Sequence, residues 1–455
     1  MPGPRNIILL VVDSLRYDVA MKQGLRMPYT QANAIQFSGA RSAGCWTLPA
    51  TTSLFTGKMP HEHGATSQTR GFRPELPTLA ERLKAAGYNT YQCTANIATT
   101  NIFGLDRGFD QVHRIYEHVT PKFRKLLNIA LMLGKPRVRK LVLSRDFMFQ
   151  RLAEDFRMGI AWAQNTYPDT FDFARRTIAE NEAKGERTFM FLNLMEAHFP
   201  YHVAPTFKLT AEGLLDKVRE SMGLFHTLNQ TFLKKGYSPV KPRIEALLKG
   251  RQEKSWNLLC NPLDEFIREM HQDKNNLVVF CSDHGDNFGE QDWVYHFSNV
   301  NDSGNRVPLL WLDHEHQKVG EKNHLVSSRY IYHDILRAAG VAVEGDSLFS
   351  ESPTNLPMLQ SYWYNNDNKT LPQYRYNQLC FIQGQDRFVY RDDVNRHYRW
   401  LHAKVAEGLG QTEPHFQAVE AGFNPIEEVV ADAQRKAYLQ QAFSEFKQFS
   451  DSIRK

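Results

Sequence analysis

Short apolar runs separated by helical stretches make up most of the first two thirds of the chain. Residues 6–13 read NIILLVVD, a continuous apolar run with sharp polar borders, which is typical of a strand buried on both faces of a parallel sheet. A helical stretch at 76–86 stops at Gly87. Further apolar runs occur at 90–94, 188–195, 277–282 and 307–312. Strands that alternate with helices predict an α/β fold built on a doubly wound sheet.

Two regions depart from this alternation. A stretch from about residue 116 to 186 is helical in composition and predicts an insertion. After about Gly345 the chain becomes rich in proline and asparagine. Short strand-like segments at 378–383, 387–391 and 397–402 and an amphipathic helix at 427–449 follow. We therefore predict a catalytic domain over 1–345 that carries the insertion, and a smaller C-terminal α+β subdomain over 346–455.

Composition narrows the class of protein. With 455 residues, 42% of them hydrophobic, the chain is neither a small disulfide-stapled domain nor largely disordered. Its five cysteines are widely spaced and form no CxxC pair, so neither a disulfide framework nor a zinc knuckle is indicated. The first apolar run is too short for a signal peptide, and no run approaches the 18 residues of a membrane span. These features predict a soluble, cytoplasmic protein.

Acidic residues follow two of the predicted strands. Asp13 ends the first apolar run, and Asp283 follows 277–282 with His284 beside it, in the segment SDHGD. Ligands of open α/β sheets bind beyond the carboxyl ends of the strands. Either aspartate alone is better explained as a turn or helix-capping residue, but the pair together with the imidazole suits Mn²⁺, Zn²⁺ or Mg²⁺. The sequence therefore predicts a divalent metal site.

Six motifs in order resemble the sulfatase family of the alkaline phosphatase superfamily. After the strand that ends in Asp13 they read CWTLPATTSLFTG at 45–57, KMPHEHG at 58–64, GLDRGFD at 104–110, EAHFPY at 196–201, and DHG at 283–285, followed by His296 and RVP at 306–308. The resemblance implies an alkaline-phosphatase-like fold, with a central, mostly parallel sheet flanked by helices. It also implies a metal-dependent hydrolase of phosphoric or sulfuric esters.

Departures from the family pattern change the expected nucleophile. Cys45 lies four residues before Pro49 instead of two, and Thr51 stands where the formylglycine motif has arginine. Formylglycine is therefore not expected, and the alignment places Thr47 at the nucleophile position. Ser14 stands where many sulfatases carry a second carboxylate. In these respects the chain is similar to phosphonate monoester hydrolases and phosphoethanolamine transferases.

The resemblance also implies roles for individual residues. Asp13, Thr47, Asp283 and His284 are the expected ligands of one divalent metal ion, which is Mn, Zn, Mg or Ca. His198 and His296 are expected to bind the transferring group or to protonate the leaving oxygen, with a structural role or a second metal as alternatives. Lys58, Gln68 and Asn96 are candidate substrate ligands, each with a surface or turn role as its alternative. His61 and His63 are expected to brace the loop behind the nucleophile.

A threonine nucleophile bears on the substrate. A sulfated threonine cannot expel sulfate by elimination, as a formylglycine hydrate can, and displacement at phosphorus is easier than at sulfur. We therefore expect a small anionic phosphate or phosphonate ester, cleaved through a phospho-Thr47 intermediate. Sulfuric ester hydrolysis is the alternative within the same fold. Hydrolysis and transfer to an alcohol both stay open, as does a homo-oligomer.

The net charge of +5 is concentrated in one segment. Residues 122–145 contain eight basic and no acidic side chains, interleaved with apolar ones, so the remainder of the chain sums to 5 − 8 = −3. A basic amphipathic segment of this kind suits a lid over an anionic substrate or a patch on anionic lipid, and equally a packed helix with a solvated face. A non-catalytic anion- or membrane-binding module is the competing class. No nucleic-acid-binding signature is present, so nucleic acid is not expected as a partner.

Overall fold

The computed structural model describes residues 6–22, 24–67, 69–115, 165–199, 201, 242–290, 294–296, 300–316, 319–350, 359–362, 376–393, 399–405 and 415–453. The basic segment 122–145 and Gln68 lie outside the described residues, and the predictions made for them stay predictions.

Eight described strands form the central sheet, in the order β11-β2-β10-β7-β1-β6-β4-β5. Their bounds are β1 Asn6–Val12, β2 Ile35–Phe37, β4 Tyr88–Thr94, β5 Gln111–Arg114, β6 Arg187–Leu194, β7 Asn276–Cys281, β10 Leu309–Leu312 and β11 Gly320–Lys322. Strand β10 pairs antiparallel with β7 and β2, and the other described pairings are parallel. This confirms the predicted, mostly parallel sheet.

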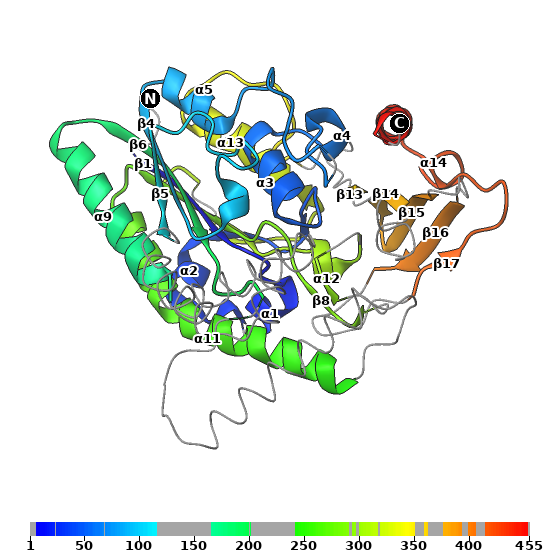
Figure 1. Ribbon diagram of the computed structural model, residues 1–455, viewed down its shortest axis with the longest axis horizontal. Coiled ribbons are helices and arrows are strands. Elements are labelled where there is room, and N and C mark those ends of the chain that lie inside the picture. The colour runs from blue at the N-terminus through cyan, green and yellow to red at the C-terminus, as the bar shows by residue number, and fades with distance from the viewer. Residues whose placement is uncertain are drawn as a thin grey trace, which may run out of the picture.

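Both faces of the sheet are covered by helices, which explains the continuous apolar run of β1. Ile8 and Leu10 face one hydrophobic core and Leu9 and Val11 the other, and all four are fully buried. Helices α1 (Tyr17–Met21), α9 (Tyr167–Ala183) and α11 (Pro242–Gln272) cover the first face. Helices α3 (Thr47–Thr56), α5 (Leu79–Ala85) and α13 (Ile331–Ala338) cover the second face (Figure 1). A strand with apolar neighbours on both sides has no solvent-facing positions to fill with polar residues.

Shorter elements complete the catalytic part of the chain. They are η1 Gly24–Arg26, α2 Pro28–Asn33, β3 Ala40–Arg41, α4 Pro60–His63, η2 Ile97–Thr99, β8 Asn287–Phe288, β9 Val294–Tyr295, α12 Asp302–Asn305, β12 Val326–Ser327 and η4 Ser328–Tyr330. Helix α9 falls within the range predicted as an insertion, and it packs on the central sheet. The proposed bounds of the insertion and of the two domains stay a prediction.

A separate antiparallel sheet forms the C-terminal subdomain, as predicted. Its described strands run in the order β13-β14-β15-β16-β17, with bounds Leu359–Tyr362, Tyr376–Gln383, Asp386–Asp393, Arg399–Lys404 and Gln417–Ala418. Helix α15 (Ala433–Ser452) packs on one face of this sheet through Leu439 and Phe446. The helix predicted at 427–449 begins later, because Asp432 caps it by accepting a hydrogen bond from the Arg435 amide at 2.7 Å. The short helix α14 (Pro425–Glu428) precedes it.

Two further sequence expectations concern cysteines and membrane spans. All five cysteines lie in the described part of the chain, where they are buried and form no disulfide. Among the described residues, no helix combines the length and the apolar character that crossing a bilayer requires.

Candidate active site

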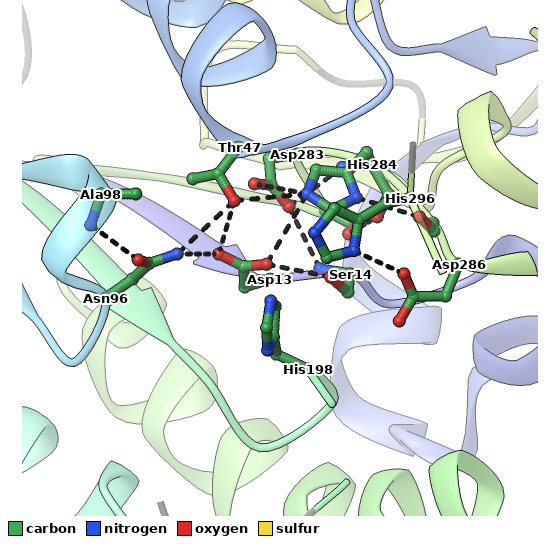
Figure 2. Close-up of polar contacts among 12 residues, drawn as sticks. Asp13, Ser14, Thr47, Asn96, Ala98, His198, Asp283, His284, Asp286 and His296 are labelled. Carbon is green, nitrogen blue, oxygen red and sulfur yellow. Dashed lines mark hydrogen bonds and ion pairs between the residues drawn. The ribbon is translucent and has the colours of Figure 1, made fainter. Parts of the chain in front are cut away.

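Two buried carboxylates meet at the carboxyl ends of neighbouring parallel strands. Asp13 follows β1 and Asp283 follows β7, and both are fully buried. Ser14 connects them, because its amide donates to Asp283 Oδ1 at 3.2 Å and its hydroxyl to Asp13 Oδ1 at 3.0 Å (Figure 2). This arrangement requires a left-handed backbone at Ser14, with φ of 62°, which is uncommon for a residue other than glycine.

His284 presents one ring nitrogen to the two carboxylates. Its Nδ1 lies 2.9 Å from the carbonyl oxygen of Gly285, which can only accept a hydrogen bond, so Nδ1 carries the proton. Its Nε2 lies 3.4 Å from Asp283 Oδ2 and 3.7 Å from Asp13 Oδ1. In the neutral ring, Nε2 therefore faces the carboxylates with its lone pair.

These three side chains fit a divalent cation. One ligand atom from each of Asp13, Asp283 and His284 lies within 4.8 Å of the others. Asp283 Oδ2 is buried and makes no hydrogen bond within the part of the chain that the structure describes. Burial and the charge of Asp13 raise the pKa of Asp283 well above its ordinary value. Because two buried carboxylates repel each other and have lost their hydration, a bound cation would stabilise both.

Thr47 places its hydroxyl against this group. It is the first residue of α3 and is buried, with Oγ1 3.5 Å from Asp13 Oδ2 and 3.4 Å from His284 Nε2 (Figure 2). The amino end of a helix carries unsatisfied N–H groups and partial positive charge. Negative charge that develops on the hydroxyl, or on an anionic group bound beside it, is therefore stabilised at this position.

Asn96 directs its amide nitrogen into the same group. Its Oδ1 accepts a hydrogen bond from the Ala98 amide at 2.8 Å, which caps η2 and fixes the orientation of the side chain. Its Nδ2 donates to Asp13 Oδ2 at 2.7 Å and lies 3.5 Å from Thr47 Oγ1. Burial acts to raise the pKa of Asp13, but the neighbouring imidazoles and this hydrogen bond outweigh it, so the pKa is lowered.

His198 and His296 lie beside Asp13, Asp283 and His284, the candidate metal ligands. The His296 ring centroid is 4.5 Å from that of His284 and 5.2 Å from that of His198. In Figure 2 the His198 ring points toward Asp13. His296 Nδ1 is 2.7 Å from Asp286 Oδ1, and Asp286 Oδ2 accepts a hydrogen bond from the Tyr201 hydroxyl at 2.8 Å. Asp286 was not singled out from the sequence, although it is the last residue of the SDHGD segment.

Comparison with known proteins assigns the chain to a family. The sequence profile of the family described as Sulfatase matches residues 5–341, which is more than half of the chain. The chain belongs to the sulfatase family. It is 24% identical to an arylsulfatase of Klebsiella aerogenes over 362 aligned residues. The aligned region covers 71% of this chain and 73% of the arylsulfatase.

Solved structures of phosphonate monoester hydrolases share the fold. A phosphonate monoester hydrolase from Silicibacter pomeroyi aligns over 98% of this chain and 95% of its own, with a TM-score of 0.60 and 16% identity. The phosphonate monoester hydrolase of Agrobacterium radiobacter aligns over 99% and 96%, with a TM-score of 0.62 and 13% identity. The chain is thus a sulfatase-family hydrolase that shares its fold with these phosphonate monoester hydrolases.

One predicted substrate ligand is not brought to this sulfatase-family site. Lys58 follows Gly57, which ends α3 with φ of 69°. Since ten helical residues span roughly 15 Å, Lys58 lies at the opposite end of α3 from Thr47. Its exposed ammonium group is 3.3 Å from Glu62 Oε1. This position fits the surface role named as the alternative for Lys58, and its contact with the substrate stays a prediction.

The two histidines after α3 lie where a bracing role was expected. His63 is fully buried; its Nδ1 accepts a hydrogen bond from the Ala65 amide at 3.0 Å, and its Nε2 lies 3.0 Å from Ser53 Oγ, on α3. His61 Nε2 lies 2.9 Å from Glu445 Oε2, on α15 of the C-terminal subdomain. His63 therefore joins the segment that follows α4 to helix α3, which begins with Thr47.

Proposed function

We propose that this sulfatase-family protein hydrolyses small phosphate or phosphonate esters through a covalent phospho-Thr47 intermediate. The observation that carries the proposal is the placement of Thr47 Oγ1, which lies 3.5 Å from Asp13 Oδ2 and 3.4 Å from His284 Nε2 at the amino end of α3. Transfer of the same group to an alcohol would use the same first step.

A divalent ion, Mn, Zn, Mg or Ca, would be held by Asp13, Asp283 and His284, with Thr47 as a further ligand. When bound, such an ion supplies positive charge that favours ionisation of a hydroxyl and neutralises an anionic ester. His198 and His296 could hold a second ion only as an alternative to their use in proton transfer. The carboxylate of Glu196, near His198 in the sequence, already accepts the Thr166 and Tyr167 amides at 2.7 and 2.9 Å.

The side chains of this site suggest how the reaction proceeds. Thr47, already ionised to its alkoxide, attacks phosphorus in line through Oγ, so that an Oγ–P bond forms and the bond from phosphorus to the leaving oxygen breaks. His198 or His296 donates a proton to that leaving oxygen. The amide of Asn96 donates to a non-bridging oxygen as its charge develops. Water then attacks phosphorus and releases Thr47, with the same imidazole accepting the proton of that water.

Phosphorus is favoured over sulfur because of the nucleophile. Threonine carries a single hydroxyl, so a sulfated Thr47 would need displacement at sulfur, whereas a phosphorylated one is opened by attack at phosphorus. The structural likeness to phosphonate monoester hydrolases supports phosphonate and phosphate esters. Sulfuric ester hydrolysis is the second candidate, and the arylsulfatase relative favours it.

The test compares nitrophenyl esters of phenylphosphonate, phosphate and sulfate with Mn²⁺-loaded protein. Thr47→Ala should abolish turnover while the thermal unfolding midpoint and Mn²⁺ content are retained, and Thr47→Ser, which keeps a hydroxyl, should retain part of it. Intact-mass analysis of acid-quenched wild type should find one phosphoryl group on Thr47.

Undiminished turnover by Thr47→Ala would refute the mechanism. Turnover of the sulfate ester alone would transfer the assignment to sulfuric esters. If wild type cleaves none of the three esters but binds anionic vesicles, the non-catalytic alternative is favoured.

A further inference from the structure

The four-residue helix α12 (Asp302–Asn305) holds the loop that leads to Thr47. The Ser42 amide donates to the carbonyl oxygen of Asn305 at 2.8 Å. In return, the side-chain amide of Asn305, which is fully buried, donates to the carbonyl oxygen of Gly44 at 2.9 Å. Since Gly44 precedes Thr47 by three residues, the position of α12 determines where α3 begins.

The same helix also holds the turn that carries Asp283 and His284. The Gly285 amide donates to the carbonyl oxygen of Gly304 at 2.7 Å. The two backbones are so close that a Cβ atom at position 285 would lie 2.2 Å from the carbonyl oxygen of Ser303, so only glycine fits there. Helix α12 therefore sets the nucleophile loop relative to the metal-type ligands.

Arg387 connects α12 to the C-terminal sheet. It lies on β15 and is fully buried, and its Nη1 donates to the carbonyl oxygen of Val300 at 2.5 Å. Its Nη2 forms an ion pair with Asp302 Oδ1. Arg41, four residues before Cys45, binds the same carboxylate through two hydrogen bonds of 2.8 and 2.9 Å. Asp302 is thus held between one arginine of the catalytic part and one of the C-terminal sheet.

Apolar packing supports the same connection. Val300, two residues before α12, is buried against Cys380, Val389 and Leu401 on one face of the C-terminal sheet. Arg387 lies on the same face of β15 as Val389, because side chains two residues apart on a strand point the same way. The chain from Val300 into α12 is therefore held by the C-terminal sheet through both an apolar side chain and a buried cation.

We infer that Arg387 is a positioning residue of the active site, which fixes α12 and through it the distance between Thr47 and the Asp283–His284 turn. A four-residue helix is not stable by itself, so its place depends on the groups that hold it. Removal of Arg387 leaves the Asp302 carboxylate buried without one of the arginines that neutralise it, and α12 is expected to shift toward water. This inference rests on the proposed role of Thr47, but its structural part does not.

Arg435 provides a matched control. It lies on α15 in the same subdomain and donates to the carbonyl oxygen of Ile382, on β14, at 2.9 Å. Arg435→Met therefore removes a guanidinium from the subdomain without touching α12.

The experiment measures kcat and KM for the best of the three aryl esters, with each variant held well below its unfolding midpoint. Because a displacement of about 1 Å can slow an enzyme roughly 100-fold, we expect Arg387→Met to lower kcat by about 10-fold to 100-fold with a smaller change in KM. Arg387→Lys, which keeps the charge and one donor, should recover part of that loss. Arg435→Met should leave kcat unchanged within about twofold.

Hydrogen exchange gives a readout that needs no substrate. In Arg387→Met, the amides of Ser42 and Gly285 should exchange faster than in wild type, because both donate to α12 carbonyls. In Arg435→Met their exchange should stay unchanged. A general loss of stability would instead accelerate exchange throughout the catalytic core, including the buried amides of β1.

The outcomes separate this inference from the proposed function. If Thr47→Ala keeps full turnover, the proposed function fails, and the exchange experiment alone decides the role of Arg387. If Thr47→Ala is inactive and Arg387→Met keeps wild-type kcat and exchange at Ser42 and Gly285, the positioning role is wrong. Should Arg387→Met not fold, Arg387→Lys decides, and wild-type kcat and exchange in that variant would overturn the inference.

Discussion

The buried imidazole of His63 predicts a loss of stability at mildly acidic pH. Its Nδ1 accepts the Ala65 amide, so in the neutral ring Nε2 carries the proton and donates to Ser53 Oγ. Protonation of Nδ1 would break the first bond and place a cation in a fully buried site. Burial, with added repulsion from His61 and Arg73, accordingly lowers the pKa of His63 to about 3.

The direction and size of this pH effect follow from the difference between the pKa of His63 in the folded and unfolded chain. In the unfolded chain His63 titrates near its ordinary value of 6.5, whereas the folded protein keeps it neutral down to about 3. The contribution of His63 to stability is therefore complete above pH 6.5 and declines as the pH falls from 6.5 toward 3. Between pH 7.5 and 5.5 the unfolded state gains about 1.3 kcal/mol from binding this proton, and the folded state gains almost nothing.

Equilibrium urea unfolding at pH 7.5 and 5.5 measures this contribution of His63 when wild type is compared with the variant His63→Gln. Glutamine has a donor and an acceptor for Ser53 and Ala65 but does not titrate. Wild type should lose about 1.3 kcal/mol more than the variant between the two pH values, because the contributions of other histidines cancel in the comparison. Equal losses in the two proteins would show that His63 is not kept neutral in the fold.

Three further outcomes follow from the site. Adding Mn²⁺ to EDTA-treated protein should raise the unfolding midpoint measured by differential scanning calorimetry. At a Mn²⁺ concentration one hundred times its dissociation constant, the stabilisation should be about 2.7 kcal/mol, and Asp283→Asn should lose most of it. Asn96→Ala should lower kcat by roughly 100-fold in steady-state assays, because it removes a donor aimed at developing charge. Lys58→Ala should keep kcat/KM within about twofold of wild type. Its free energy of unfolding should change by about 1 kcal/mol or less, because the ion pair of Lys58 with Glu62 is exposed. A larger loss of kcat/KM would support Lys58 as a substrate ligand.

The central strands could be predicted because burial on both faces leaves a clear pattern. The run at 6–13 corresponds to β1, and 277–282 corresponds to β7, each within one residue at either end. Strands β2 and β11 have three residues each, too few for a run to stand out. The antiparallel direction of β10 was also not predictable, because a buried strand has the same apolar pattern in either direction.

The sequence could predict that Asp13, Asp283, His284 and Thr47 lie close together, because each belongs to a short local motif. Asp13, Asp283 and His284 follow strand ends that the sheet brings together, and Thr47 begins a helix at the same edge. Lys58 lies close to Thr47 in sequence, yet the intervening helix places it at the other end of α3. Proximity along the chain is therefore a poor guide once a helix begins.

The contribution of the C-terminal sheet could not be predicted, because it rests on pairs far apart in sequence. Asp302 and Arg387 are separated by 85 residues, and neither lies in a motif. Segments of the catalytic part contact both faces of that sheet. Val300 packs on the face that carries Arg387, and Ala43, next to the Ser42 amide, joins Leu379 and Phe381 in the core of the other face. Since Ala43 leads to Thr47 and Val300 follows His296, the two segments that carry these side chains are fixed relative to each other through one sheet. The C-terminal subdomain is therefore part of what holds the reacting groups in place.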